Sequence, residues 1–109
     1  MPNGCFGTAK PLANTKTTIF TVPAGKVATV NVNVANAAEF AASVSLYIGP
    51  APAQGAEWDA RYCVEPATLV QGRGVLHRTA FVMTAGESLA IVTDSAYISV
   101  RADGFEEEA

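Results

Sequence analysis

The chain has 109 residues, half of them hydrophobic and 16% charged, and it carries a formal net charge of −3 at pH 7. This length accommodates one domain with a single core, and the hydrophobic content excludes an intrinsically disordered chain. The seven Lys and Arg residues are scattered singly, so the basic stripe typical of duplex-binding proteins is missing and we expect no nucleic-acid partner.

The N-terminal residues 1–15 contain two Pro, two Gly and two Asn, a composition that predicts an extended arm rather than a regular element. The arm lacks the apolar core of a signal peptide. No apolar run in the sequence approaches the ~20 residues that a membrane-spanning helix requires. We therefore expect neither a targeting signal nor a membrane partner.

The two cysteines, Cys5 and Cys63, form no CxxC pair. They are interpreted either as reduced thiols or as partners in a disulfide, within one chain or between chains. Cys5 lies between glycines in the predicted arm, where a bond to a neighbouring subunit would be sterically easy.

Strand patterns begin after the arm. Residues 17–22 are rich in Thr, Ile, Phe and Val and predict a strand, which a Pro-Ala-Gly turn at 23–25 follows. From residue 26 onward, Ala and Val at even positions alternate with polar residues, and this period of two predicts a half-buried strand with its Asn side chains on the wetter face. A loop at 36–41 precedes a second alternating strand at 43–48.

The second half opens with the longest predicted loop, residues 49–57, which holds two Pro and two Gly. Residues 58–64 form a weaker strand, which Pro66 either ends or limits to a sheet edge. Further strands, separated by Gly-containing or Asp-Ser turns, are predicted at 75–83, 88–93 and 97–102.

These seven strand candidates, without a convincing helix, predict an all-β fold: an antiparallel β-sandwich of about seven strands, either jelly-roll or Ig-like. A small β-barrel is the alternative. The sandwich domain would span residues 16–102, between the arm and an acidic C-terminal tail at 103–109. The period-two pattern assigns the core to Ile19, Val30, Val32, Val44, Leu46, Leu89, Ile91, Ile98 and Val100.

Two segments, TVPAGKVATVNV and VMTAGESLAIVT, share an apolar stretch, a turn that ends in Ala-Gly, a charged residue and a strand. We interpret both as the same hairpin-type entry into a strand. Gly25 and Gly86 would then occupy a position that needs a positive φ.

His77, the only histidine, lies within a predicted strand, and no nucleophile motif stands nearby. It is interpreted as a surface or interface residue rather than a general base, and a lone histidine makes no metal site. We therefore expect no enzymatic activity, no metal and no cofactor. The Gly72–Gly74 segment, GRG, precedes no helix and is interpreted as a turn rather than a phosphate cradle.

Carboxylates stand close to aromatic residues in one segment: Glu57, Asp59 and Glu65 flank Trp58 and Tyr62. This arrangement fits sugar binding, in which rings form a platform and carboxylates accept hydroxyl hydrogen bonds. It also fits a polar edge strand that aromatic side chains anchor to the sheet.

The tail holds four of the ten acidic residues. The rest of the chain has six acidic and seven basic residues, so its net charge is close to zero. The tail is interpreted as a solvated end or as an arm that pairs with basic residues of a neighbouring subunit. In the second interpretation Phe105 is the apolar anchor, and Glu106, Glu107 and Glu108 supply the charge.

The order of TIFTVPAGKVATVNVNVAN, SVSLYIG, EWDARYCVEPATL and GVLHRTAFVMTAGESLAIVTDSAYISVRADGFEE resembles a family of small bacteriophage virion proteins. The shared pattern consists of a VPAG turn, an Asn-bearing strand, a GVLxRTxxVxxAGExL hairpin and a closing SVRxxGFEE. The resemblance covers roughly residues 16–108. It implies a β-sandwich accessory part of the particle: a head decoration or cement protein, or a small tail, collar or baseplate component.

The resemblance transfers no catalytic residue. It implies a location in the virion, which is assembled in the host cytoplasm, and contacts with copies of the same chain, a trimer being one arrangement, and with major capsid or tail proteins. A carbohydrate- or host-surface-binding module that recognises a host glycan is the alternative. The candidate subunit-contact residues are Cys5, Phe6, Trp58, Tyr62, Phe105, Glu106, Glu107 and Glu108.

Overall fold

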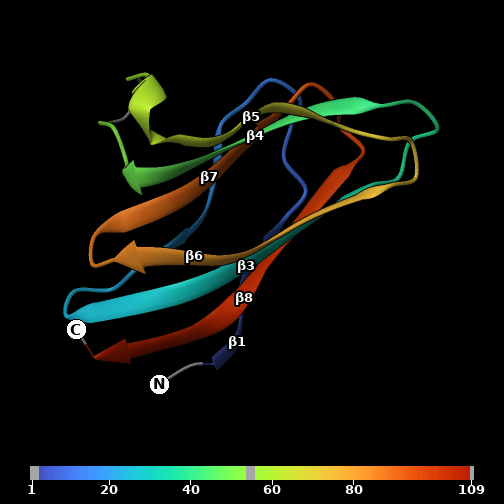
Figure 1. Cartoon of the computed structure of the whole chain (residues 1–109). Coiled ribbons are helices and arrows are strands. Elements are labelled where there is room, and N and C mark those ends of the chain that lie inside the picture. Colours follow the sequence, from blue (N-terminus) through green and yellow to red (C-terminus); the bar gives the residue numbers. More distant parts are fainter. Residues whose placement is uncertain (1–2, 54–55, 109) are drawn as a thin grey trace.

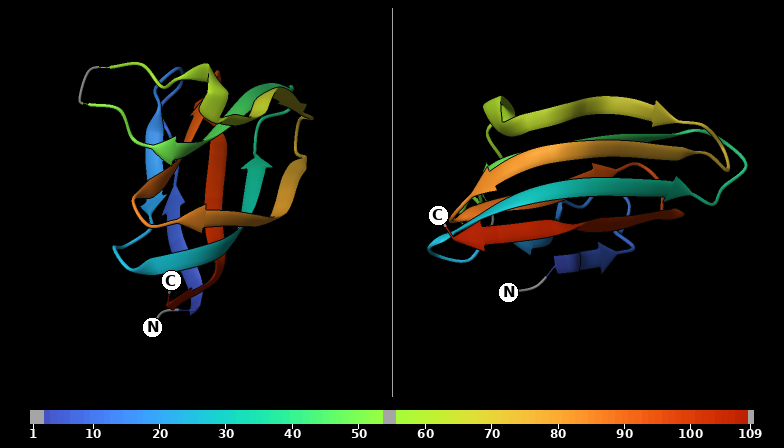
Figure 2. Two further views of the ribbon diagram at one scale, coloured as in Figure 1. Left: turned by 60° about the vertical axis from the view of Figure 1, so that its left-hand side comes forward. Right: turned by 60° about the horizontal axis from the view of Figure 1, so that its bottom comes forward.

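The computed structural model describes residues 3–53 and 56–108 and shows two four-stranded antiparallel sheets packed face to face (Figure 1). The β-sandwich expected from the sequence is therefore confirmed, with eight strands. The strands run along the long dimension of the molecule (Figure 2). They are β1 Asn3–Ala9, β2 Thr17–Thr21, β3 Lys26–Asn36, β4 Ala42–Pro50, β5 Cys63–Val70, β6 Val75–Thr84, β7 Glu87–Thr93 and β8 Ile98–Glu108.

The strand order is β1-β8-β3-β6 in the first sheet and β2-β7-β4-β5 in the second. Every connection except the one between β4 and β5 carries the chain from one sheet to the other. This order is that of a jelly roll, an eight-stranded double sheet built from two Greek keys. Among the described residues the two separate sheets exclude the barrel, and the strand order distinguishes the jelly roll from the Ig-like sandwich.

The predicted N-terminal arm was wrong for the residues that form β1. This strand pairs with β8, from Asn3 opposite Phe105 to Ala9 opposite Val100, with a bulge between Cys5 and Gly7. At the bulge the Phe6 ring stacks on Phe20, with 4.5 Å between the centroids. The glycines of this segment had argued against a strand. Glycine is nevertheless required at position 7 for the two sheets to approach, because a Cβ there would lie 2.5 Å from a carbonyl oxygen of the second sheet.

The predicted acidic tail was also wrong as a separate segment, because β8 continues to Glu108 and pairs with β3 without a register shift. Alternation persists through the acidic run: Ala102 and Glu106 are buried, whereas Phe105 and Glu107 are exposed. The backbone of β3 pairs with this acidic segment and keeps it in the sheet, although the composition of the segment does not predict a strand.

The weak strand predicted at 58–64 is mostly absent. Residues Ala60–Tyr62 instead form one turn of 3₁₀ helix, η1, at whose start the Asp59 carboxylate accepts a hydrogen bond from the Arg61 backbone N–H at 3.0 Å. Strand β5 begins after this turn and runs through Pro66. Of the two alternatives for Pro66, the edge position is the one found, since β5 pairs only with β4 among the described strands and a proline is tolerated there.

The core lies between the sheets and matches the residues chosen from the alternating pattern. Eight of the nine predicted core residues are at most 3% exposed, and the ninth, Ile19, packs against the core while partly buried. Residues that enlarge the core beyond this prediction are Val22, Ala28, Val34, Ala42, Val70, Leu76, Met83 and Ala102.

The two Ala-Gly turns have the positive φ angles expected for them, 78° at Gly25 and 86° at Gly86. They are not hairpins within one sheet, because β2–β3 and β6–β7 each change sheet. The turns also bind each other: the Val22 backbone N–H donates to Glu87 O at 2.9 Å, and the Gly86 N–H donates to Val22 O at 3.0 Å. The similarity of the two segments thus marks two crossings at the same end of the sandwich.

Candidate interaction surface

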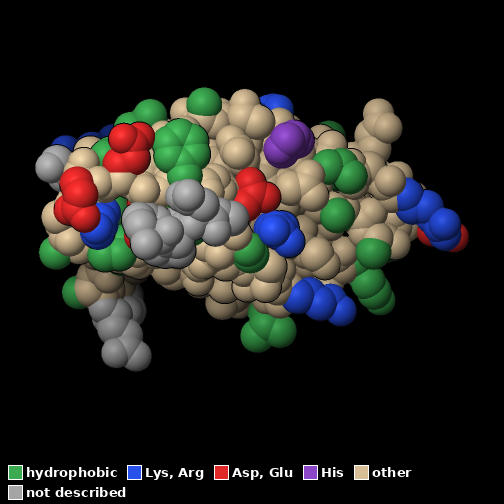
Figure 3. All heavy atoms as spheres, turned by 90° about the horizontal axis from the view of Figure 1, so that it is seen from below, with side chains coloured by type: hydrophobic (Ala, Val, Ile, Leu, Met, Phe, Trp, Pro, Cys, Tyr) green, Lys and Arg blue, Asp and Glu red, His purple; other side chains and the backbone are tan. Residues whose placement is uncertain are grey.

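The outer surface of the first sheet, called here the β8 face, is built from the outward side chains of its four strands. Register places odd-numbered residues of β3 opposite odd-numbered residues of β8, while their even-numbered neighbours are mostly buried. Figure 3 shows the molecule from below, where charged side chains, the histidine and hydrophobic side chains are spread over a largely tan surface. The principal outward residues of the β8 face are Cys5, Thr8, Val27, Thr29, Asn31, Asn33, Ala35, Val75, His77, Val82, Ser99, Arg101, Asp103, Phe105 and Glu107.

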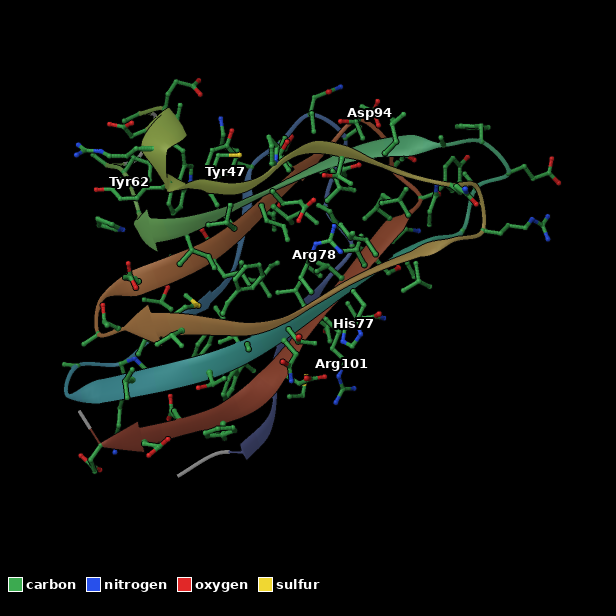
Figure 4. All side chains as sticks on the ribbon, in the orientation of Figure 1. Tyr47, Tyr62, His77, Arg78, Asp94 and Arg101 are labelled. Atoms are coloured by element: carbon green, nitrogen blue, oxygen red, sulfur yellow. The ribbon has the colours of Figure 1, made fainter. Side chains whose placement is uncertain are left out.

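A polar row crosses all four strands of the face. Asn33 lies opposite both His77 of β6 and Arg101 of β8, and Arg101 lies opposite Thr8 of β1. Figure 4 shows His77 and Arg101 on the same side of this sheet. His77 is exposed, as expected for a surface histidine.

A hollow of about 520 Å³ lies at the β1 side of this row. Two cationic side chains, Lys10 and Arg101, line it together with hydroxyl, amide and small apolar groups. Among the described residues Lys10 is the one basic residue that forms no ion pair with a carboxylate. Arg101 donates through Nε to Asp103 at 3.3 Å, and this is the one side-chain hydrogen bond that it makes to a described residue.

Exposed apolar side chains lie at two places on the face. Phe105 and Val82 flank Thr29 in one cross-strand row, and they are 45% and 66% exposed. Val75, on β6, is 62% exposed. Large apolar groups on a flat sheet surface are typical of a surface that another protein covers. Of the residues predicted to contact a neighbour, Phe105 is therefore available for that role.

The three glutamates expected to act together point in different directions. Glu106 faces the sandwich interior and is 7% exposed. Glu108 forms an ion pair with Lys26 of the same chain, and the hydrogen bond from Lys26 lowers the pKa of the Glu108 carboxyl. Glu107 is exposed on the β8 face and forms no ion pair with a described residue. Only Glu107 thus offers its charge outward from this face.

The aromatic residues of the EWDARYC segment gather on the second sheet. The Trp58 ring lies 5.7 Å from the ring of Tyr47 and 6.4 Å from that of Tyr62, the latter pair edge to face. The Tyr62 ring covers Gly49 so closely that a Cβ on Gly49 would lie 2.5 Å from the ring. Figure 4 places Tyr47 and Tyr62 together beside β4 and η1. These contacts hold Tyr62 of η1 and Trp58 of the segment before it against β4.

The carboxylates beside these rings already have partners within the chain. Glu57 accepts a hydrogen bond from Lys16 Nζ at 2.8 Å, and this contact lowers the pKa of Glu57. Asp59 accepts from the Arg61 backbone and side chain, and these bonds lower the pKa of Asp59. A sugar hydroxyl would therefore compete with existing ion pairs for these acceptors.

The remaining predicted contact residues divide between surface and interior. Cys5 is exposed on the β8 face opposite Asp103, whereas Phe6 is packed inside against Phe20. Cys63 begins β5 in the other sheet, and both thiols are free. The structure therefore contains no disulfide between them.

The sequence interpretation overlooked Lys10 and Asn36. Lys10 lay in the segment assigned to the arm. Its position beside Arg101 at the hollow follows only from the pairing of β1 with β8. Asn36 stood at the start of a predicted loop, but it is 2% exposed, and its even number puts it on the inner face of β3. Continued alternation was the signal that could have identified its burial.

Among residues 3–53 and 56–108 no group of three or more His, Cys, Asp or Glu side chains could hold a metal ion. Within the same ranges there is no helix of sufficient length and apolarity to cross a membrane. Comparisons of the chain with protein-family models, curated proteins and solved structures found no match.

Proposed function

We propose that this protein is a structural component of a bacteriophage virion, a capsid decoration or cement protein that stabilises the particle through subunit contacts. The resemblance of its segment order to small virion proteins motivates the proposal. The partners are copies of the same chain and the major capsid protein, and the location is the assembled particle. No catalytic step, cofactor or metal belongs to this role.

The observation that carries the proposal is the β8 face. Its exposed Val75, Val82 and Phe105 stand on a regular sheet between polar groups, so a partner would bury apolar surface and meet hydrogen-bonding groups at the rim. The sandwich beneath it has one continuous cluster of buried apolar side chains between its sheets, which makes it a close-packed body. A decoration protein needs both properties, a firm body and an adhesive face.

Mass spectrometry of purified particles, from the phage whose genome encodes the chain, tests the proposal. We expect the protein in many copies per particle and immunogold label over the head. Particles assembled without it should release their DNA at a lower temperature than complete particles. Absence of the chain from purified particles would refute the proposal, and label confined to the tail or collar would move it to the alternative tail, collar or baseplate role.

A second candidate is a glycan-binding module, which the clustering of Tyr47, Trp58 and Tyr62 favours. Aromatic rings next to Glu57 and Asp59 are the groups that sugar recognition uses, although both carboxylates are engaged in ion pairs. Trp58 is the only tryptophan, so its fluorescence reports directly on this cluster. A saturable change in this fluorescence with host surface glycans would support this candidate, and an unchanged spectrum across a glycan panel would remove it.

A further inference from the structure

We propose that the β8 face binds the same face of a second copy of this chain across a two-fold axis, so that Glu107 of each copy meets Lys10 and Arg101 of the other. The inference deepens the self-contact within the proposed function by naming its surface and symmetry. It concerns association of the purified chain, which is measured without particles.

The charges on this face are separated along the strands. Lys10 and Arg101 line the hollow near one end, and Glu107 stands six residues further along β8. At roughly 3.3 Å per residue this separation is roughly 20 Å. The exposed Phe105 and Val82 lie between the two ends. Asp103 also lies between the two ends, in an ion pair with Arg101. The unpaired charges of the face are therefore basic towards one end and acidic at the other, with Phe105 and Val82 on the Glu107 side of the space between them.

A two-fold axis in the plane of contact and across the strands makes this pattern self-complementary. It reverses the strand direction, so that the basic end of one copy meets the acidic end of the other, twice per dimer. The apolar rows then meet near the axis. Isologous contacts of this kind are the commonest in soluble homo-oligomers, and facing sheets pack with their strands aligned within about 30°.

The charge inventory favours a second copy as the occupant. Lys10 is the basic residue without an intramolecular ion pair among the described residues, and Glu107 is an exposed acidic residue without one on the same face. The symmetric contact pairs these two groups with each other. An unrelated partner would need to carry the matching pattern independently, with an acidic group and a basic group roughly 20 Å apart.

The available area is adequate for a specific contact. Four strands about 4.8 Å apart, with lengths up to the eleven residues of β3 and β8, give a flat area of roughly 600 Å² per copy. A standard interface buries about 800 Å² per partner once the relief of the side chains is included. Charged rims and an apolar centre are the usual division within such an interface.

The test uses charge reversal and mixing, followed by sedimentation velocity of the purified chain. We expect the wild type to dimerise, and the double variant Lys10→Glu/Arg101→Glu and the variant Glu107→Lys each to weaken dimerisation by roughly tenfold or more, because both rim contacts become repulsive. An equimolar mixture of the two variants should recover dimers. In the mixed dimer one contact has reversed charges and the other is wild type, so both are attractive.

Matched controls reverse charges elsewhere: Arg61→Glu on η1 and Glu39→Lys in the β3–β4 loop, both exposed. Their dimerisation should equal that of the wild type. Val82→Asp, at the middle of the face, should abolish dimers independently of the rim charges, and circular dichroism should show that each variant is folded. A wild type that stays monomeric, or a mixture that fails to recover dimers, overturns the inference while leaving attachment to particles to its own test.

Discussion

Arg78 Nε donates a hydrogen bond to Glu65 Oε1 at 2.8 Å and thereby joins edge strand β6 of one sheet to edge strand β5 of the other. A second bond runs from Arg78 Nη2 to Glu65 Oε2 at 3.3 Å, and the Thr68 hydroxyl also donates to Glu65. Figure 4 shows Arg78 directed from β6 towards the space between the sheets. Inward charges on edge strands hinder pairing with other chains, so this contact closes one open side of the sandwich.

Because of this ion pair, the free energy of unfolding should decrease at acid pH. The hydrogen bonds from Arg78, followed by that from Thr68, hold the pKa of Glu65 below its usual 4.5. A lowered pKa in the folded state means that the stabilisation is fully present above pH 4.5 and is lost as the pH falls through the folded value. The difference in unfolding free energy between wild type and Glu65→Gln should therefore be largest near neutrality, about 1–2 kcal/mol, and should shrink in acid.

Denaturant unfolding at a series of pH values measures this difference. Glu39→Gln is the matched control, because the Glu39–Arg73 pair is exposed on both sides and should contribute little at any pH. A difference between wild type and Glu65→Gln that stays constant from neutral to acid pH would contradict the assignment.

Asn36 is predicted to be the most important polar residue of the interior. Its side-chain amide donates to the carbonyls of Phe40 at 3.0 Å and Val70 at 3.1 Å, and its Oδ1 accepts from the Ala38 N–H at 3.0 Å. Asn36→Leu leaves these buried groups without partners, so we expect a loss of about 2–3 kcal/mol in unfolding free energy. Asn33→Ala on the outer face should change it by less than about 0.5 kcal/mol, and equal effects of the two substitutions would disprove this role.

Gly104 is predicted to tolerate no side chain. Its φ is 145°, and a Cβ there would lie 2.0 Å from the Thr29 carbonyl oxygen on the adjacent strand. Gly104→Ala must displace the backbone of β3 or β8, which we expect to lower the unfolding free energy by about 2 kcal/mol or more. Gly25→Asn is the control, because Gly25 also has a positive φ but no atom within 4 Å of its Cβ position. Thermal unfolding of both variants measures the two effects. A Gly104→Ala protein as stable as the control would show that β3 and β8 can move apart to accept the side chain at little cost.

Phe6 tests whether β1 belongs to the folded body. Because its ring stacks on Phe20 and packs against the core, Phe6→Ala should lower the unfolding free energy by about 1–3 kcal/mol. Leu12→Ala is the comparison, since Leu12 is 72% exposed and its removal should have little effect. If the two variants melt at the same temperature, the N-terminal residues behave as the arm that composition suggested.

The parts of the fold that sequence predicts well are the strands with one buried face. In β3 and β4 the alternation of Val and Leu with polar residues follows the pleat directly, because successive side chains point to opposite faces. The same reasoning selected Leu89, Ile91 and Ile98 correctly. The jelly-roll order was not selected over the Ig-like one, because pairing between distant strands leaves no mark on either partner alone.

The misses share a physical cause, which is stabilisation supplied by a neighbouring strand. β1 is rich in Gly and Asn, and the end of β8 is rich in Glu, yet backbone pairing with β8 and β3 respectively keeps both extended. The same holds for the candidate surface. Lys10 and Glu107 lie far apart in sequence, and only the register of β1, β8 and β3 places them on one face.

The most direct test of the account is particle binding by variants that differ only in where a charge is placed on the surface. Phe105→Asp alters the β8 face, whereas Leu69→Asp alters an exposed apolar residue on β5 of the other sheet, and the two side chains are 45% and 71% exposed in the wild type. Quantitative mass spectrometry of particles assembled with each variant should show Phe105→Asp largely lost and Leu69→Asp retained at the wild-type copy number. Equal incorporation of the two variants would contradict the claim that the β8 face makes the subunit contacts through which this protein is held in the particle.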